Sequence, residues 1–163
     1  MIIAIIIISF FLEGIFTNLI SIHSLLIPLF TVTSLTILYP YFNSNNLKFV
    51  SISAIVGFFY DIIYTDSLFV NTLSFAIISI AIIIIYNYIN MNWININILN
   101  IVVVILYKIV SYFILSLVGY LKFSSAVMIR GIYQSIIVNV LYGLIIYFVT
   151  YKVGKQLNLK KME

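Results

Sequence analysis

The sequence predicts an all-α integral membrane protein, a bundle of six transmembrane helices, and three observations lead to this fold class. The 163-residue chain is 64% hydrophobic and only 7% charged, whereas a soluble domain is about 45–50% apolar and about 25% charged. Its mean hydropathy is +1.25. Apolar stretches close to the ~20 residues that a membrane crossing requires alternate with short polar connections. We therefore expect a single polytopic membrane domain over residues 1–163.

The first two crossings are expected over about 2–20 and 25–42. The first differs from a signal peptide because no basic segment precedes it, Glu13 interrupts the apolar run, and no small-residue cleavage site follows. Pro28 lies near the start of the second crossing and Pro40 near its end. A helix tolerates proline at such terminal positions, so we predict one continuous helix there.

The third and fourth crossings are expected over about 49–63 and 68–86. The Asn- and Ser-containing residues 43–46 form a polar turn before the third crossing. Residues 64–67 form a second tight, polar connection.

The last two crossings are expected over about 98–118 and 127–151. An Asn-rich connection with Trp93 precedes the fifth, and the alternating Ile and Asn of 94–97 predict an interfacial stretch, where tryptophan anchors well. Residues 119–125 join the last two crossings.

The distribution of lysines predicts the orientation. Cytoplasmic connections carry an excess of Lys and Arg, and six crossings place both termini on one side. With a cytoplasmic C-terminus, Lys48 also lies inside, while Lys122 and Asp66 lie outside. Four lysines follow the last crossing and suit contact with anionic lipid, namely Lys152, Lys155, Lys160 and Lys161. We therefore expect a multi-pass protein of the cell membrane with both termini in the cytoplasm.

The composition argues against several functional classes. The chain has no cysteine, so a disulfide framework, a thiolate metal site and a cysteine nucleophile are excluded. Its basic residues are too few and too scattered for nucleic-acid binding. His23 is a lone histidine, which leaves a metal site or a serine nucleophile without partners. Asp61 and Asp66 come from one short turn, whereas an aspartic-protease dyad comes from two elements. We expect a non-enzymatic protein without cofactor or metal.

Charged residues inside the apolar stretches are the candidate functional residues, because a charge in hydrocarbon persists only where a partner or a cavity supports it. With the predicted topology Glu13, Asp61, Lys108 and Arg130 all fall in the outer half of the membrane, and mutual pairing is the least costly arrangement. Gly57 lies one turn from Asp61 and allows close helix approach. Three interpretations remain open: a fold-fixing ion-pair network, a proton or substrate pathway, and a partner-docking surface.

Two segments carry a resemblance to a known family. Residues 11–19 read FLEGIFTNL and residues 56–65 read VGFFYDIIYT, while an arginine opens the sixth crossing and Asn139 lies within it. In these features, and in length, number of crossings and lysine-rich tail, the whole chain resembles the rod shape-determining protein MreD family. Glu13, Gly57, Asp61 and Arg130 match family motif positions, whereas Lys108 is singled out only by its charge and depth. The Asn-rich connection around Trp93 departs from any motif of the family.

The resemblance implies a fold and a function. The fold would be similar to the six-helix S-components of energy-coupling-factor transporters. The function would be a scaffold of the cell-elongation machinery that docks an MreC-like protein and helps position peptidoglycan synthases. MreB, RodA and a class B penicillin-binding protein would belong to the wider complex. The alternative is a vitamin-binding S-component, but after Ala4 the first crossing lacks the A-x-x-x-A pattern by which those proteins dock their coupling subunit.

Overall fold

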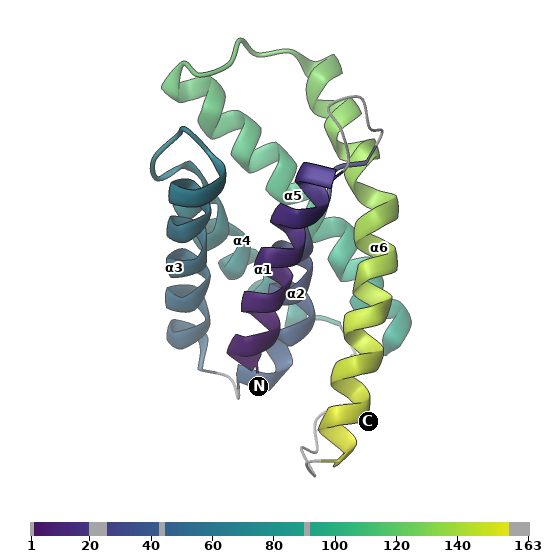
Figure 1. Ribbon diagram of the computed structural model, residues 1–163. Coiled ribbons are helices and arrows are strands. Elements are labelled where there is room, and N and C mark those ends of the chain that lie inside the picture. Colours follow the sequence, from purple (N-terminus) through teal and green to yellow (C-terminus); the bar gives the residue numbers. More distant parts are fainter. Residues whose placement is uncertain (1, 20–25, 43–44, 90–91, 157–163) are drawn as a thin grey trace.

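The computed structural model describes residues 2–19, 26–42, 45–89 and 92–156, and within these ranges all regular structure is helical. Six α-helices and one 3-10 turn follow one another as an antiparallel bundle (Figure 1). Their bounds are α1 Ile2–Leu19, α2 Phe30–Leu38, η1 Tyr39–Phe42, α3 Asn46–Tyr64, α4 Val70–Tyr86, α5 Trp93–Val118 and α6 Ser125–Gln156.

Four of these helices are long and apolar enough to cross a membrane: α1, α3, α5, and α6 over Ser125–Lys152. The helix α4 is a shorter apolar helix. The described ends of the chain, at α1 and α6, lie at the same end of the bundle (Figure 1).

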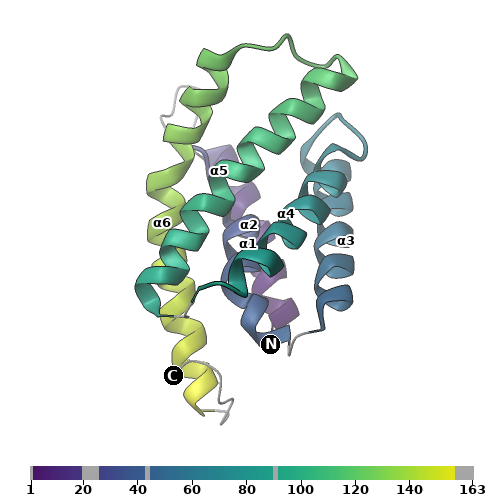
Figure 2. The same ribbon diagram turned by 180° about the vertical axis from the view of Figure 1, so that it is seen from behind.

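Successive helices pack as hairpins, α1 on α2, α3 on α4 and α5 on α6, and α2 also contacts α4, α5 and α6. Figure 2 shows α5 and α6 converging at one end of the bundle and diverging toward residues 119–124. Gly119 ends α5 with a φ of 86°, a left-handed conformation that glycine adopts without strain. No residue from 108 to 134 is buried in this outer part of the hairpin.

The helix α2 is the central element and differs most from expectation. Only nine residues are α-helical where a crossing over 25–42 was predicted, and every residue from Pro28 to Phe42 is buried. Pro28 disfavours the α conformation in the residue before it, so the segment 26–29 enters the bundle without helical structure. Pro40 lacks an N–H group and lies in η1, where the α-helix has ended.

Two other boundaries also differ. The helix α5 begins at Trp93, five residues before the predicted crossing, and within its first turns the Asn97 side-chain amide donates to the Trp93 carbonyl at 2.7 Å. The helix α3 begins at Asn46, where the Asn45 side chain accepts the N–H of Lys48 at 3.1 Å.

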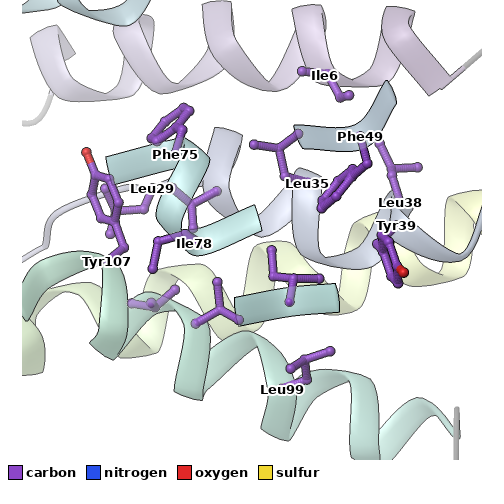
Figure 3. Packing of buried hydrophobic residues seen from close by; sticks show 14 of the residues in the cluster. Ile6, Leu29, Leu35, Leu38, Tyr39, Phe49, Phe75, Ile78, Leu99 and Tyr107 are labelled. Carbon is purple, nitrogen blue, oxygen red and sulfur yellow. The ribbon is translucent and has the colours of Figure 1, made fainter. Parts of the chain in front are cut away.

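The apolar core surrounds α2. Its main cluster combines residues of α1 to α5 and η1. Figure 3 shows Leu35, Leu38, Tyr39 and Phe49 grouped in one part of this cluster and Leu29, Phe75, Ile78 and Tyr107 in another. A smaller cluster on the α6 side includes Phe30 and Tyr142, whose rings stack with centroids 4.1 Å apart. Burial of large side chains on all sides holds α2 in place.

Candidate functional site

Glu13 lies inside the bundle and binds the start of α2. Its side chain is 1% exposed. One carboxylate oxygen accepts the backbone N–H of Thr31 at 2.9 Å and the Thr31 hydroxyl at 2.7 Å. The other oxygen accepts the hydroxyl of Tyr60, on α3, at 2.8 Å. Leu29, which precedes α2, offers no side-chain cap, so Glu13 supplies the acceptor that the free N–H groups of a helix start require.

Asp61 performs the same task for α4. Its side chain is fully buried, and one oxygen accepts the backbone N–H of Asn71 at 2.9 Å and the Asn71 amide at 3.0 Å. The second oxygen accepts the N–H of Thr72 at 2.9 Å and the Thr72 hydroxyl at 2.8 Å. Phe69, which precedes α4, has a left-handed backbone and no side-chain cap. A negative charge at a helix start also interacts favourably with the helix dipole.

A further contact extends the Asp61 site to α5. The hydroxyl of Tyr107 donates to the Asn71 side-chain oxygen at 2.6 Å. Asn71 thus donates to Asp61 with its amide and accepts from Tyr107, which connects three helices through buried hydrogen bonds.

Gly57 sets the distance between α3 and α4. A Cβ atom at this position would lie 2.6 Å from the Asn71 carbonyl oxygen and 2.9 Å from the Thr72 Cα. Because these are backbone atoms, only glycine allows the helices to approach this closely. The close approach brings Asp61, one turn further along α3, to the first N–H groups of α4.

Gly14 has a related role beside Glu13. A Cβ at this position would lie 2.6 Å from the ring of Tyr64. The Tyr64 hydroxyl donates to the Phe10 carbonyl at 2.9 Å, and the rings of Phe10 and Tyr64 lie 4.8 Å apart. The tyrosines Tyr60 and Tyr64 therefore join α3 to α1 with their side chains.

Asn139 of α6 holds the non-helical segment before α2. Its side-chain oxygen accepts the N–H of Leu29 at 2.8 Å, and its amide donates to the carbonyls of Ile27 and Ser135. The N–H of Ile27 donates to the Gln134 carbonyl at 3.0 Å. These bonds replace the ones that a helix would have provided, as a buried backbone requires.

Hydrogen bonding of buried polar side chains is less complete at the neighbouring contact of α5 with α6 and at Thr33 of α2. Asn100 donates to the Asn139 carbonyl at 3.0 Å, and a Cβ at Gly143 would lie 2.9 Å from the same Asn100 amide nitrogen. The side-chain oxygens of Thr33, Asn97 and Asn100 are buried without a hydrogen-bond partner among the described residues. Each such group costs about 1–3 kcal/mol.

The predicted cluster of charges is thus only partly brought together. Lys108 is half-buried on α5 and lies within electrostatic range of Glu13. Arg130 is exposed on α6, and no hydrogen bond or ion pair joins it to another described residue. The two carboxylates are bound by amides and hydroxyls instead of by cations. His23 lies outside the described residues.

Sequence reasoning missed the donors. Thr31, Tyr60 and Thr72 were assigned no role, although polar side chains within apolar stretches were the available signal. Within the described ranges, no group of three or more His, Asp or Glu side chains is arranged to hold a metal ion.

Comparison of the chain with protein-family models, with curated proteins and with solved structures finds no match.

Proposed function

We propose that the chain is a non-enzymatic scaffold of the MreD type, which docks the single transmembrane helix of an MreC-like protein and helps position peptidoglycan synthases. The two segments that resemble the family, 11–19 and 56–65, lie on α1 and α3. A groove between these two helices supports the proposal.

The observation that carries the proposal is an apolar groove between these two helices. It has a volume of about 320 Å³ and is lined only by apolar side chains, Ile6, Ile7, Phe10 and Phe11 of α1 and Val56, Phe59 and Ile63 of α3. Ile7, Phe11, Phe59 and Ile63 are each about half exposed, so the groove opens to the outside of the bundle. A partner helix that inserts large aliphatic side chains would fill it, because packing drives helix association in lipid.

The two carboxylates support a structural role. Each oxygen of Glu13 and Asp61 already accepts a hydrogen bond of 2.8 or 2.9 Å from a donor within the bundle. A general acid or base needs access to a substrate proton, and these oxygens are buried. The exposed Arg130 is the charged candidate residue that a partner reaches most directly.

In the proposed topology the chain crosses the cell membrane six times and has both termini in the cytoplasm. The helix α2 with η1 and its extended entry segment makes the second crossing. Irregular backbone is tolerated at membrane depth where protein surrounds it, and residues 28–42 are all buried. Lysines at the C-terminal end would contact anionic lipids. MreB, RodA and a class B penicillin-binding protein would be more distant partners.

Co-purification of the MreC-like protein tests the docking. Val56→Trp and Ile63→Trp fill the groove and should reduce the recovered partner at least about tenfold, with loss of normal cell shape. Ile145→Trp is the matched control, since Ile145 is 59% exposed on α6, away from the groove. Equal partner recovery from the groove variants and the control, at equal expression, would contradict the proposal.

The same purified protein also tests the alternative function, a vitamin-binding S-component of a transporter. A vitamin retained by the purified protein, or tight vitamin binding in calorimetry without any MreC-like partner, would identify a substrate-binding S-component instead. A scaffold should yield neither result.

A further inference from the structure

The side-chain hydrogen bonds that join α3 to α1 come from two tyrosines of α3. The helix α1 packs mainly on α2, and α3 packs mainly on α4. Tyr60 and Tyr64 extend from α3 to reach Glu13 and the Phe10 carbonyl at 2.8 and 2.9 Å. The ring of Phe10, which also lines the groove, packs against both tyrosines, with its centroid 6.1 Å from that of Tyr60 and 4.8 Å from that of Tyr64. A change in the separation of α1 and α3 must therefore move these side chains.

Tyr60 donates to the Glu13 carboxylate, which also caps the start of α2. Glu13 accepts from Tyr60 with one oxygen and from Thr31 with the other. Thr31 is the second residue of α2, and its N–H points along the helix axis toward the carboxylate. Any displacement of Glu13 by Tyr60 therefore alters the cap of α2 directly.

The start of α2 is also suited to respond to a displacement of Glu13. The helix α2 has only nine residues, and isolated helices shorter than about 12–15 residues are marginal even in water, so α2 depends on contacts with its neighbours. Its entry segment is held by Asn139 and by the Gln134 carbonyl, both on α6. Loss of the Glu13 cap leaves the Thr31 N–H without its acceptor, while Asn139 and the Gln134 carbonyl of α6 still hold the entry segment.

We propose that the Tyr60–Glu13–Thr31 link couples the width of the groove between α1 and α3 to the conformation of the start of α2. A residue that fills the groove separates α1 from α3, weakens the Tyr60 hydrogen bond and loosens the first turn of α2. The identity of the natural occupant rests on the proposed function, but the coupling itself does not. Tyr64 donates its hydroxyl hydrogen bond to the Phe10 carbonyl of α1 and not to the Glu13 carboxylate, so it supports the same contact without a hydrogen bond to the residue that caps α2.

Hydrogen–deuterium exchange of the Thr31 amide tests this coupling in the purified full chain. Tyr60→Phe should accelerate exchange at Thr31 about fivefold or more, the lower range of coupling between sites. Tyr64→Phe, which removes the matched hydroxyl from the same contact, should leave it within about twofold. The Thr72 amide, which Asp61 binds, is the internal reference because general destabilisation would accelerate both amides.

A groove-filling variant completes the test. Val56→Trp should accelerate exchange at Thr31, and adding Tyr60→Phe should cause no further increase; Ile63→Phe replaces Val56→Trp if that variant does not fold. Equal effects of Tyr60→Phe and Tyr64→Phe would overturn the proposal, as would a groove-filling effect that adds fully to that of Tyr60→Phe. Since no partner is present, absence of co-purification would contradict the docking function while leaving this result unaffected.

Discussion

Glu13 and Asp61 both cap a helix that has no cap of its own, yet they do so in different settings. Asp61 and its donors Asn71 and Thr72 lie in adjacent helices, ten and eleven residues apart in the chain. Glu13 binds Thr31 of α2 and Tyr60 of α3, which are eighteen and forty-seven residues away. Asp61 itself binds only one other helix, that of its own hairpin, and reaches α5 through Asn71, whereas the Glu13 carboxylate directly binds residues of two other helices.

The glycines near the two carboxylates differ in a similar way. Gly57 faces the backbone of α4, which has no freedom to withdraw, whereas Gly14 faces the ring of Tyr64, a side chain that can turn aside. The same residue type thus allows a rigid contact next to Asp61 and an adjustable one next to Glu13. The comparison teaches that the α3–α4 hairpin is the fixed part of the molecule and the contact of α1 with α3 its adjustable part.

Removal of either carboxylate should lower the unfolding free energy most, and it tests the difference between Glu13 and Asp61 most directly. Asp61→Ala leaves two backbone N–H groups and two side-chain donors of α4 without an acceptor, and we expect a loss of about 3–5 kcal/mol of unfolding free energy. Glu13→Ala removes the acceptor of one backbone N–H and two hydroxyls, and we expect about 2–3 kcal/mol. Denaturant unfolding in mixed micelles measures both. An equal or larger loss for Glu13→Ala would invalidate the distinction.

Alanine substitution of the glycines should have an intermediate effect. Gly57→Ala forces α3 away from the α4 backbone, and we expect a loss of about 1–3 kcal/mol. Gly14→Ala should cost less because the Tyr64 ring can move. Gly131 of α6 is the control, since a Cβ there meets nothing within 4 Å and alanine gains up to about 1 kcal/mol in helix propensity. The same unfolding experiment reports all three, and a Gly14→Ala loss above that of Gly57→Ala would reverse our assignment of the rigid contact.

The smallest effect on stability is expected from Arg130→Glu. Its exposed side chain binds neither carboxylate, so the unfolding free energy should change by no more than about 0.5 kcal/mol. Arg130 does not line the groove, so the expected fall in recovery of the MreC-like partner would show that the docking surface extends to this part of α6, where a reversed charge changes recognition. A large loss of stability would mean that Arg130 takes part in the central network, and unchanged recovery would confine docking to the groove.

Sequence reasoning located the carboxylates but not their hydrogen-bond donors. Glu13 and Asp61 stood out because charges are rare in apolar stretches, and Coulomb attraction suggested Lys108 and Arg130 as partners. The structure satisfies both carboxylates with the free N–H groups of helix starts. This solution was not predictable because it depends on where α2 and α4 begin, and neither helix start bears a capping residue in the chain.

The helical character of the chain followed from its composition, but the form of the second crossing did not. Pro28 and Pro40 were interpreted as tolerated ends of one helix, whereas they delimit a nine-residue helix between a non-helical segment and a 3-10 turn. Tolerating that entry segment requires Asn139, 110 residues beyond Leu29. Local propensity contains no information about so distant a hydrogen bond.

The dependence of this segment on α6 has a consequence for biosynthesis. During translation α1 and the following residues leave the ribosome long before Asn139 is made. Until then the N–H of Leu29 and the carbonyl of Ile27 lack the acceptor and donor that they have in the finished bundle. We infer that α2 settles into the bundle late, after the last helix arrives, and that a nascent chain halted before α6 should remain open to proteases around residues 26–29.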